Sequence, residues 1–460
     1  YPIYSEVMEH CTILKTRKDF YFVFMNRAYP KNMKILDEII RKRDQLARLI
    51  GFNSFSELDL DSQMVKSPQK AREFLLNLSE KTMKKSDKEF AKLKSDLPGD
   101  IKLDENEKMF PWDYKYVKQF YKKKNFNIDE RDVAQYFPVE NTLNQVFDIY
   151  QRFLGLEFKP VDAEGLWHED VKVIRVYDKE TGEDRGTLFL DLYPRENKYS
   201  HACMAEIVAT TKRKDLRTGK EIVVPAVIVV IANFPKATED RPALLKYDDV
   251  QTFFHEFGHA MHGFLGRTQM ASFSGTSVKR DFVEMPSQMF EEWMWNKDIL
   301  RKVSKHYKTG ESLPDDLIDK MISLKLFDSG FFVTRQVYLS LLALDYFGSG
   351  AKKDTNNIKR VLYKKYINHI RFEPGTHFQT SFGHLIGYGA KYYGYMWSKV
   401  FALDMFNEVR KVGLLDIEMG RKLEKDVLGK GGSIDPEILL RNFLGRAPNQ
   451  EAFLREYGIH

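Results

Sequence analysis

Residues 252–262 read Thr-Phe-Phe-His-Glu-Phe-Gly-His-Ala-Met-His, an H-E-x-x-H motif within an apolar run. In a helix, positions i and i+4 lie one turn apart on one face, so His255 and His259 can bind the same metal ion. Two neutral imidazoles, a third protein ligand and one open position make up a catalytic zinc site. Glu256 lies beside that face, where a general base can take a proton from the attacking water and pass one to a leaving amine. The motif therefore predicts a zinc site with His255 and His259 as ligands and Glu256 as the base.

The residues around the motif favour a buried helix over 249–265. Asp248 is expected as its N-cap, and Gln251 three residues later would complete a start that resembles a capping box. The helix has a wide apolar face, formed by Val250, Phe253, Phe254, Phe257, Met261 and Phe264. The alternative is a core helix whose histidines only satisfy backbone groups, because H-E-x-x-H also occurs by chance.

The third ligand is expected downstream of the motif. A three-histidine site would need a histidine ten residues after His255, but Leu265 occupies that position. A second helix is expected from Asp281 onward, where Asp281 could orient a ligand imidazole. His262 lies about 10 Å along the helix axis from His255, so we interpret it as a neighbour of the site. The candidate carboxylate ligands are Glu284, Glu291 and Glu292.

Composition excludes several other classes of protein. The chain has 460 residues, 43% of them hydrophobic, which permits two to three domains and a large core. A net charge of +6 from 72 basic and 66 acidic residues indicates a mixed surface and no nucleic-acid partner. Cys11 and Cys203 form no disulfide framework, which favours a reducing compartment and a cytoplasmic location. No apolar run approaches about 18 residues, so no association with a membrane is expected.

The chain before the motif divides into a helical part and a strand-rich part. Lys31–Ile50 follows the 3.6-residue period and ends at Gly51, and Ser67-Pro68 begins another helix. Between residues 170 and 235, Val171–Tyr177 and Gly186–Tyr193 predict a hairpin. A third run, Val223–Ile231, has Pro225 near its start and is expected as an edge strand. A peptidase could hold a substrate backbone there; a small covering sheet is the alternative.

Glycines and tyrosines are interleaved over residues 382–397. The segment lacks the G-x-x-x-x-G-K-[ST] pattern and no strand precedes it, which argues against a nucleotide-binding loop. We expect a flexible loop running into a helix, which would present phenol groups as hydrogen-bond donors to an oxyanion. A tyrosine-rich packing loop is the alternative.

Taken together, these motifs resemble the thimet oligopeptidase and neurolysin family of zinc metallopeptidases. The resemblance implies a mainly α, elongated zincin-type peptidase with a deep substrate channel and a small β-sheet beside the zinc helix. It also implies that residues 1–150 form part of the channel wall and residues 151–460 the catalytic region. The matching segments are FHEFGHAMH (254–262), FSGTSVKRDFVEMPSQM (273–289), DLYPRENKYSHA (191–202), FGHLIGYGAKYYGYMWSKV (382–400) and NFLGRAP (442–448).

The resemblance implies cleavage of short peptides at internal bonds, with one zinc ion per chain and Glu256 as the general base. The residues that match the family's zinc ligands are His255, His259 and Glu284. The residues that match its substrate-binding or intermediate-stabilising groups are His384, Tyr388, Tyr392 and Tyr395, with Tyr395 and His384 assigned to catalysis and the other two to substrate binding.

The chain departs from the family in two places. The family carries a long helical segment before the position of Tyr1, so that segment is either missing here or supplied as a separate chain. The loop at Leu385-Ile386-Gly387-Tyr388 is one residue shorter than in thimet oligopeptidase and is similar to that of the mitochondrial intermediate peptidase branch. A processing peptidase in mitochondria and a carboxy-dipeptidase are therefore the alternatives within the class, and a silent peptide-binding protein is the alternative outside it.

Overall fold

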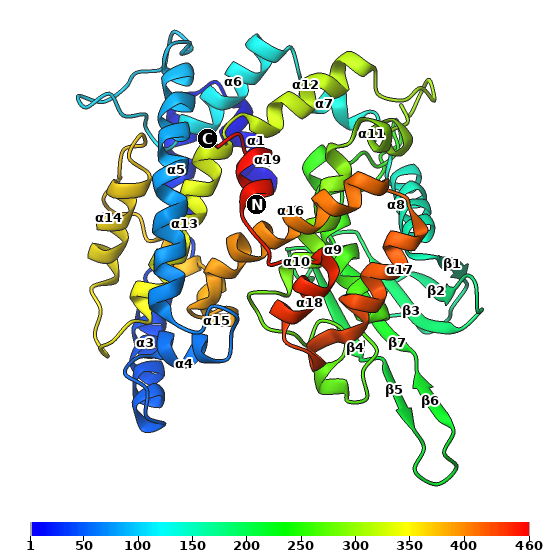
Figure 1. The fold of residues 1–460 in the computed structure, drawn as a ribbon. Coiled ribbons are helices and arrows are strands. Elements are labelled where there is room, and N and C mark those ends of the chain that lie inside the picture. The colour runs from blue at the N-terminus through cyan, green and yellow to red at the C-terminus, as the bar shows by residue number, and fades with distance from the viewer. Residues whose placement is uncertain (1, 460) are drawn as a thin grey trace. The chain divides into compact units, whose positions relative to one another are not determined.

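The computed structural model describes residues 2–459, and the chain divides into two compact units. Unit 1 comprises residues 1–128, 323–396 and 454–460, and unit 2 comprises residues 129–322 and 397–453. The mainly helical fold expected from the sequence is confirmed (Figure 1). The units do not coincide with the expected regions 1–150 and 151–460, whose division of roles stays a prediction. Among the described residues, no helix is long and apolar enough to cross a membrane.

Unit 1 is built mainly of helices. They are α1 (Pro2–His10), α2 (Leu14–Met25), α3 (Lys31–Leu49), α4 (Phe55–Asp61), α5 (Pro68–Lys94), α6 (Tyr114–Phe126), α13 (Ser329–Tyr346), α14 (Thr355–Tyr366) and α15 (His384–Gly387), with short 3₁₀ turns at Phe378–Ser381 and Lys391–Tyr393. Three further helices, α12 (Asp315–Leu326), α16 (Gly394–Val412) and α19 (Glu451–Glu456), include residues of both units.

The start of α5 and the end of α3 lie where the sequence predicts them. The Ser67 hydroxyl caps α5 by accepting from the Lys70 N–H at 3.3 Å, and Gly51 follows α3 with φ of +92°. Helix α5 packs along α13, where the Glu89 carboxylate accepts the N–H groups of Gly330 and Phe331 at 3.1 and 3.0 Å. A buried carboxylate therefore satisfies donors at the start of α13 that a helix leaves without partners.

Unit 2 combines helices with a sheet. Its helices are α7 (Glu130–Ala134), α8 (Val139–Leu154), α9 (Tyr247–Leu265), α10 (Glu284–Glu291), α11 (Lys297–Val303), α17 (Ile417–Asp426) and α18 (Pro436–Leu444), with 3₁₀ turns at Ala271–Phe273, Glu292–Trp295 and Leu428–Ser433. Its strands are β1 (Leu156–Val161), β2 (Lys172–Asp178), β3 (Asp184–Asp191), β4 (Cys203–Val208), β5 (Thr211–Lys214), β6 (Glu221–Val224) and β7 (Ala226–Ile231).

The five-stranded sheet has the order β1-β2-β3-β7-β4, and only β3 and β7 pair in parallel. The predicted β2–β3 hairpin is confirmed. The prediction that Val223–Ile231 is one edge strand is wrong, because Pro225 separates β6 from β7 and β7 lies inside the sheet. Proline has no N–H to donate to a neighbouring strand. The chain therefore stops pairing with β5 at Pro225, and from Ala226 it pairs with β3 and β4. The edge strand on this side is β4, which follows from the strand order.

Helix α9 is packed against β7, β4 and α10, and its phenylalanines are buried. It begins at Tyr247 with Lys246 as the N-cap, so the prediction of Asp248 as the cap is wrong. The Lys246 N–H donates to the Asp249 carboxylate at 3.1 Å, and this contact places the helix start two residues earlier than expected. Two carboxylates in the first turn also favour this end of the helix dipole.

Candidate metal centre

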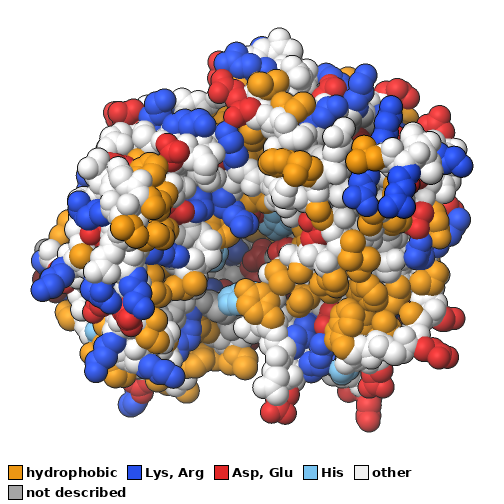
Figure 2. All heavy atoms as spheres, turned by 90° about the horizontal axis from the view of Figure 1, so that it is seen from below, with side chains coloured by type: hydrophobic (Ala, Val, Ile, Leu, Met, Phe, Trp, Pro, Cys, Tyr) orange, Lys and Arg blue, Asp and Glu red, His pale blue; other side chains and the backbone are white. Residues whose placement is uncertain are grey.

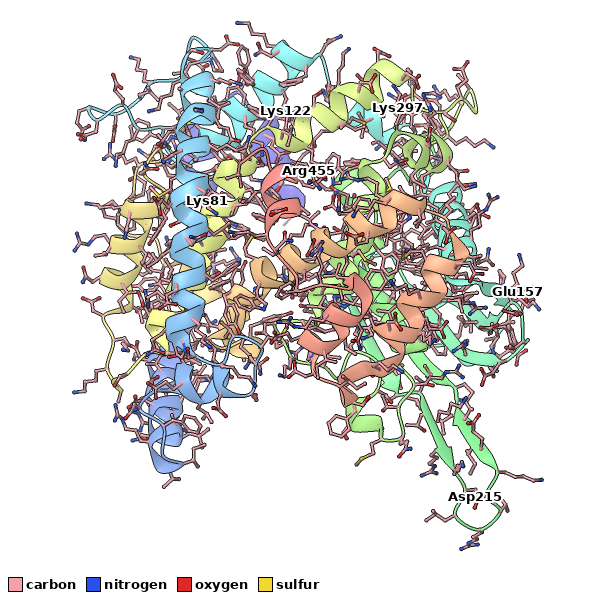
Figure 3. All side chains as sticks on the ribbon, in the orientation of Figure 1. Lys81, Lys122, Glu157, Asp215, Lys297 and Arg455 are labelled. Atoms are coloured by element: carbon pink, nitrogen blue, oxygen red, sulfur yellow. The ribbon has the colours of Figure 1, made fainter. Side chains whose placement is uncertain are left out.

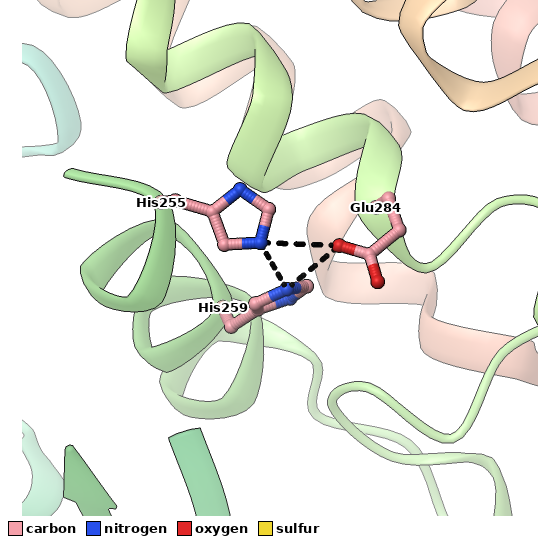
Figure 4. A group of neighbouring side chains, drawn as sticks. All are labelled: His255, His259 and Glu284. Carbon is pink, nitrogen blue, oxygen red and sulfur yellow. Dashed lines mark hydrogen bonds and ion pairs between the residues drawn. The ribbon is translucent and has the colours of Figure 1, made fainter. Parts of the chain in front are cut away.

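Three side chains meet between α9 and α10 (Figure 4). The Nε2 atoms of His255 and His259 lie 3.2 Å apart, and the Glu284 Oε2 atom lies 3.2 Å from the first and 3.1 Å from the second. Two imidazole nitrogens this close cannot both direct lone pairs at each other unless a proton or a cation lies between them. Two histidines and one glutamate are also the donor set of a catalytic zinc site. The residues present therefore fit a divalent cation of that kind.

The geometry depends on how closely α10 crosses α9. A Cβ atom built on Gly258 would lie 2.8 Å from the Cα atom of Ser287, so only glycine permits this approach. Gly258 occupies a variable position of the H-E-x-x-H motif, and Ser287 follows Glu284 by one turn. The close crossing brings the Glu284 carboxylate to the two imidazoles. This role of Gly258 was not predicted from the sequence, although a glycine inside a helix is itself a signal of close packing.

Opposite charges are concentrated at this centre. Burial favours the protonated Glu284 carboxyl, but the imidazoles of His259 and His255 outweigh it and hold the pKa of that carboxyl well below its usual range. Burial opposes a charge on His255, but the carboxylates of Glu284 and Glu291 raise its pKa well above the ordinary value. The pocket therefore stabilises an anionic carboxylate next to a proton on the His255 imidazole, and a metal ion that binds there would displace that proton.

The charged side chains of Glu291, Glu292 and Lys399 lie next to the metal centre, and Glu291 orients the His255 imidazole. The Glu291 Oε1 atom lies 2.7 Å from His255 Nδ1, which turns the Nε2 atom of that ring toward Glu284. Lys399, buried in α16, contacts Glu291 at 3.1 Å and Glu292 at 2.8 Å. Of the two other candidate ligands in the sequence, Glu291 thus contacts the far side of the His255 imidazole, where a carboxylate fixes its tautomer and orientation, and Glu292 pairs with Lys399. The sequence offered no signal for Lys399.

Two further residues of α9, Glu256 and His262, lie near the three clustered side chains in sequence. Glu256 is partly exposed. Burial, with a smaller contribution from the Glu256 carboxylate, raises the pKa of the Cys203 thiol at the start of β4. His262 is buried, and within the described part of the chain neither of its ring nitrogens has a hydrogen-bond partner. Burial lowers its pKa to about 3, with a smaller contribution from His259, so it is neutral. The structure keeps His262 outside the three-residue group, as the helix spacing predicts.

The Gly/Tyr segment lies in unit 1 up to residue 396 and is more ordered than the expected loop. It forms α15, a 3₁₀ turn and the start of α16, with Gly389 at φ of +58° between them. Asp59 of α4 holds this turn by accepting the Ala390 N–H at 2.9 Å and by pairing with Lys391. The turn therefore has a fixed anchor within its own unit.

The four predicted residues of this segment form one aromatic cluster. The ring of Tyr395 lies 5.1 Å from Tyr388, 5.2 Å from Tyr392 and 5.7 Å from His384, measured between centroids. Burial raises the pKa of Tyr392 to about 12, so its phenol is neutral at physiological pH. The structure brings these side chains together, and their roles in catalysis stay predictions.

Fold and site together define a metallopeptidase of the zincin type. The profile of Peptidase family M3 matches residues 7–459. The chain therefore belongs to Peptidase family M3, and the resemblance noted in its motifs is confirmed.

Similar curated proteins cover the whole chain. Thimet-like oligopeptidase of Dictyostelium discoideum is 36% identical over 473 residues, which are 100% of this chain and 69% of the relative. Oligopeptidase A of Escherichia coli (strain K12) is 33% identical over 471 residues, which are 100% of this chain and 68% of the relative. A solved structure of PZ peptidase A with an inhibitor has a TM-score of 0.60 at 14% identity over 99% of this chain and 69% of that one, a similarity of fold.

Proposed function

We propose that the chain is a zinc-dependent endo-oligopeptidase that hydrolyses short peptides. The observation that carries this proposal is the meeting of His255, His259 and Glu284 in a member of a peptidase family. These three residues would hold one zinc ion, since their donor set is that of catalytic zinc. Bound zinc would supply a Lewis acid that lowers the pKa of water and polarises a carbonyl group.

The chain's own residues would move the proton and stabilise charge. Glu256 would accept a proton from the attacking water and deliver it to the amine of the departing peptide. Tyr395, with His384, would donate hydrogen bonds to the carbonyl oxygen as it gains negative charge. Tyr388 and Tyr392 would contact the peptide. Glu291 would keep His255 in its binding orientation through the contact at Nδ1.

The peptide would bind as an added strand along β4. This strand pairs with β7 on one side and is the edge of the five-stranded sheet. Its backbone groups can therefore align an extended peptide, whatever its sequence, beside α9. Such backbone recognition suits an enzyme that cleaves many short peptides.

We infer a cytoplasmic location, since Cys11 and Cys203 are both free thiols. The alternatives within the same chemistry are a carboxy-dipeptidase and a mitochondrial processing peptidase, the second suggested by the short Leu385–Tyr388 loop. Their products differ from those of an endo-oligopeptidase.

The test is cleavage of quenched fluorescent peptides of graded length, with mass identification of every product. We expect internal cleavage of short peptides, loss of activity with 1,10-phenanthroline, and recovery when zinc is added back. Cleavage at the same rate with and without the chelator, or no cleavage at all, would contradict the proposal. Release of C-terminal dipeptides alone would replace it with the carboxy-dipeptidase alternative.

A further inference from the structure

The edge strand β4 connects the metal centre to a protruding hairpin. Its first residue, Cys203, lies close enough to Glu256 for that carboxylate to raise the thiol pKa, and the strand packs along α9. After Val208 the chain continues into β5 and returns through β6, a separate two-stranded ladder. At about 3.3 Å per residue, an extended peptide on β4 would reach the hairpin roughly 20–30 Å from the cleaved bond.

The base of this hairpin is anchored. The Lys212 N–H donates to the Thr268 carbonyl at 2.9 Å, and the buried Thr210 hydroxyl donates to the Val224 carbonyl at 2.9 Å. Exposed apolar side chains lie on β4, which leads to the base of the hairpin, and on the segment after Thr268. They include Ile207, which is 58% exposed, and Met270, which is 59% exposed. A peptide that follows β4 would meet this apolar surface before it meets the hairpin.

The hairpin arm, residues 211–224, carries a concentrated positive charge. It holds five basic and two acidic residues, a net charge of +3, whereas the whole chain of 460 residues has a net charge of +6. Half of the excess charge is thus placed on 14 residues. The basic residues are Lys212, Arg213, Lys214, Arg217 and Lys220.

Most of that charge is not neutralised by ion pairs among residues 2–459. Lys212 pairs with Glu221 at 2.9 Å, and the Asp215 carboxylate accepts the backbone N–H groups of Arg217 and Thr218 at the tip (Figure 3). Across the described residues, the other four basic side chains make no ion pair within 4 Å. Figure 2 is seen from the side toward which the hairpin extends in Figure 1, and it shows basic, acidic and hydrophobic side chains on this face.

We infer that the β5–β6 hairpin is a recognition arm for acidic residues in the substrate, located at the end of the peptide far from the cleaved bond. This inference rests on the proposed peptidase function and adds a substrate class to it: oligopeptides with a terminal block of aspartate or glutamate. Four solvated cations raise the local concentration of an acidic peptide and speed its association, an effect that salt screens.

A nucleic-acid role fits the same arm less well. Single-stranded nucleic acid binding combines basic side chains with aromatic rings on which bases stack. Residues 211–224 contain no aromatic side chain and no histidine, and the tip carries the fully exposed Leu216 instead. A basic arm beside an unpaired strand edge is the arrangement expected for an extended acidic peptide.

The test compares peptides that share one short central sequence. An acidic block (Glu and Asp) or its neutral isostere (Gln and Asn) is attached about eight residues from the cleaved bond, at the N-terminal or the C-terminal end. We expect the acidic block at one of the two ends to raise kcat/KM about five- to tenfold at low salt, and about 0.5 M NaCl to abolish the difference.

The decisive variant is K214E/R217E, because both side chains are exposed and neither makes an ion pair with another described residue. Its matched control is K305E/K308E, which reverses two exposed lysines just after α11, at the end of unit 2 opposite the hairpin in Figure 1. The hairpin variant should lose the preference and the control should keep it, while all three proteins cleave the short central peptide equally.

Equal cleavage of acidic and neutral peptides by the parent, or a preference that survives K214E/R217E, would overturn the inference. No cleavage of the short peptide would instead remove the peptidase proposal itself.

Discussion

The metal centre and the Gly/Tyr segment are built on opposite physical principles. The candidate metal centre between α9 and α10 consists of buried and partly buried charges, each with a partner, held by a close helix crossing at Gly258. The Gly/Tyr segment consists of neutral rings around Tyr395, held by a turn that one carboxylate, Asp59, anchors. Substitutions in the metal centre should abolish catalysis or cause a large loss of stability. Substitutions in the Gly/Tyr segment should lower the catalytic rate by smaller factors.

The largest effect is expected at Glu256, the proposed general base. Glu256→Gln keeps the shape of the side chain but cannot accept a proton, so kcat should fall by about 10²–10⁴ or more. Zinc content should stay at the parent level, since Glu256 is not among the three clustered residues. Parallel measurement of turnover and bound metal checks this. A metal-loaded variant with more than about a tenth of the parent rate would exclude Glu256 as the base.

Removal of the cation behind the metal centre should cost stability. Lys399→Met removes the cation that the partly buried Glu291 and the buried Glu292 share, so the free energy of unfolding should fall by about 3–5 kcal/mol. The control on the same helix is Lys411→Met, which removes an exposed pair with Glu408 and should cost under about 1 kcal/mol. Urea unfolding measures both. Equal, small losses would show that the Lys399 pairs contribute little.

In the Gly/Tyr segment, Tyr395→Phe removes one hydroxyl and no packing. If that hydroxyl stabilises the developing oxyanion, kcat should fall by about 10²–10³ with little change in KM. Steady-state kinetics on one short peptide separates the two constants. An unchanged kcat would take Tyr395 out of the mechanism, and a raised KM alone would move it to substrate binding.

Glu206 on β4 lies beside α9, and its Oε1 atom is buried with no hydrogen-bond partner among the described residues. Burial of Glu206 on β4 raises its pKa from 4.5 to about 7. The folded state then binds more protons than the unfolded state between these values, so stability should fall as pH rises from about 4.5 to 7 and level off above that. The expected loss is about 1–3 kcal/mol, reduced by partial exposure of the side chain. Thermal unfolding from pH 4.5 to 8 should show this slope in the parent and a smaller one in Glu206→Gln; identical slopes would refute it.

The smallest effect is expected from the turn that holds the aromatic cluster. Gly389→Ala places a side chain at φ of +58° and a Cβ atom 2.5 Å from the Asp59 carboxylate, which should cost about 1–2 kcal/mol and lower kcat about tenfold. Gly387→Ala is the matched control, because a Cβ atom there meets nothing within 4 Å. Kinetics of the two variants on one peptide should therefore differ. Equal rates would show that the turn does not position the cluster.

The sequence was informative where a single local pattern determines the structure. The spacing of His255 and His259 predicted the metal helix, and the family resemblance supplied Glu284, which the structure brings to both imidazoles. The Ser67-Pro68 start of α5 and the β2–β3 hairpin were also predictable, since caps and alternation are local signals.

Features that depend on tertiary contacts were not predictable. A proline such as Pro225 marks either an edge or a break, and only the pairing of β7 with β3 shows that it is a break. Strand β1 was missed because it follows Gly155 directly after α8 and contains Pro160. Lys399 lies more than a hundred residues from Glu291 and Glu292, so no spacing could connect them.

The most direct test of the proposed metal centre is the metal content of the purified chain, measured by mass spectrometry of the dissolved protein together with a Glu284→Gln variant. The proposed centre should hold one zinc ion per parent chain and bind it much more weakly in the variant, because the carboxylate that meets both imidazoles is lost. A parent chain without stoichiometric metal, or a variant that holds zinc as tightly as the parent, would contradict it.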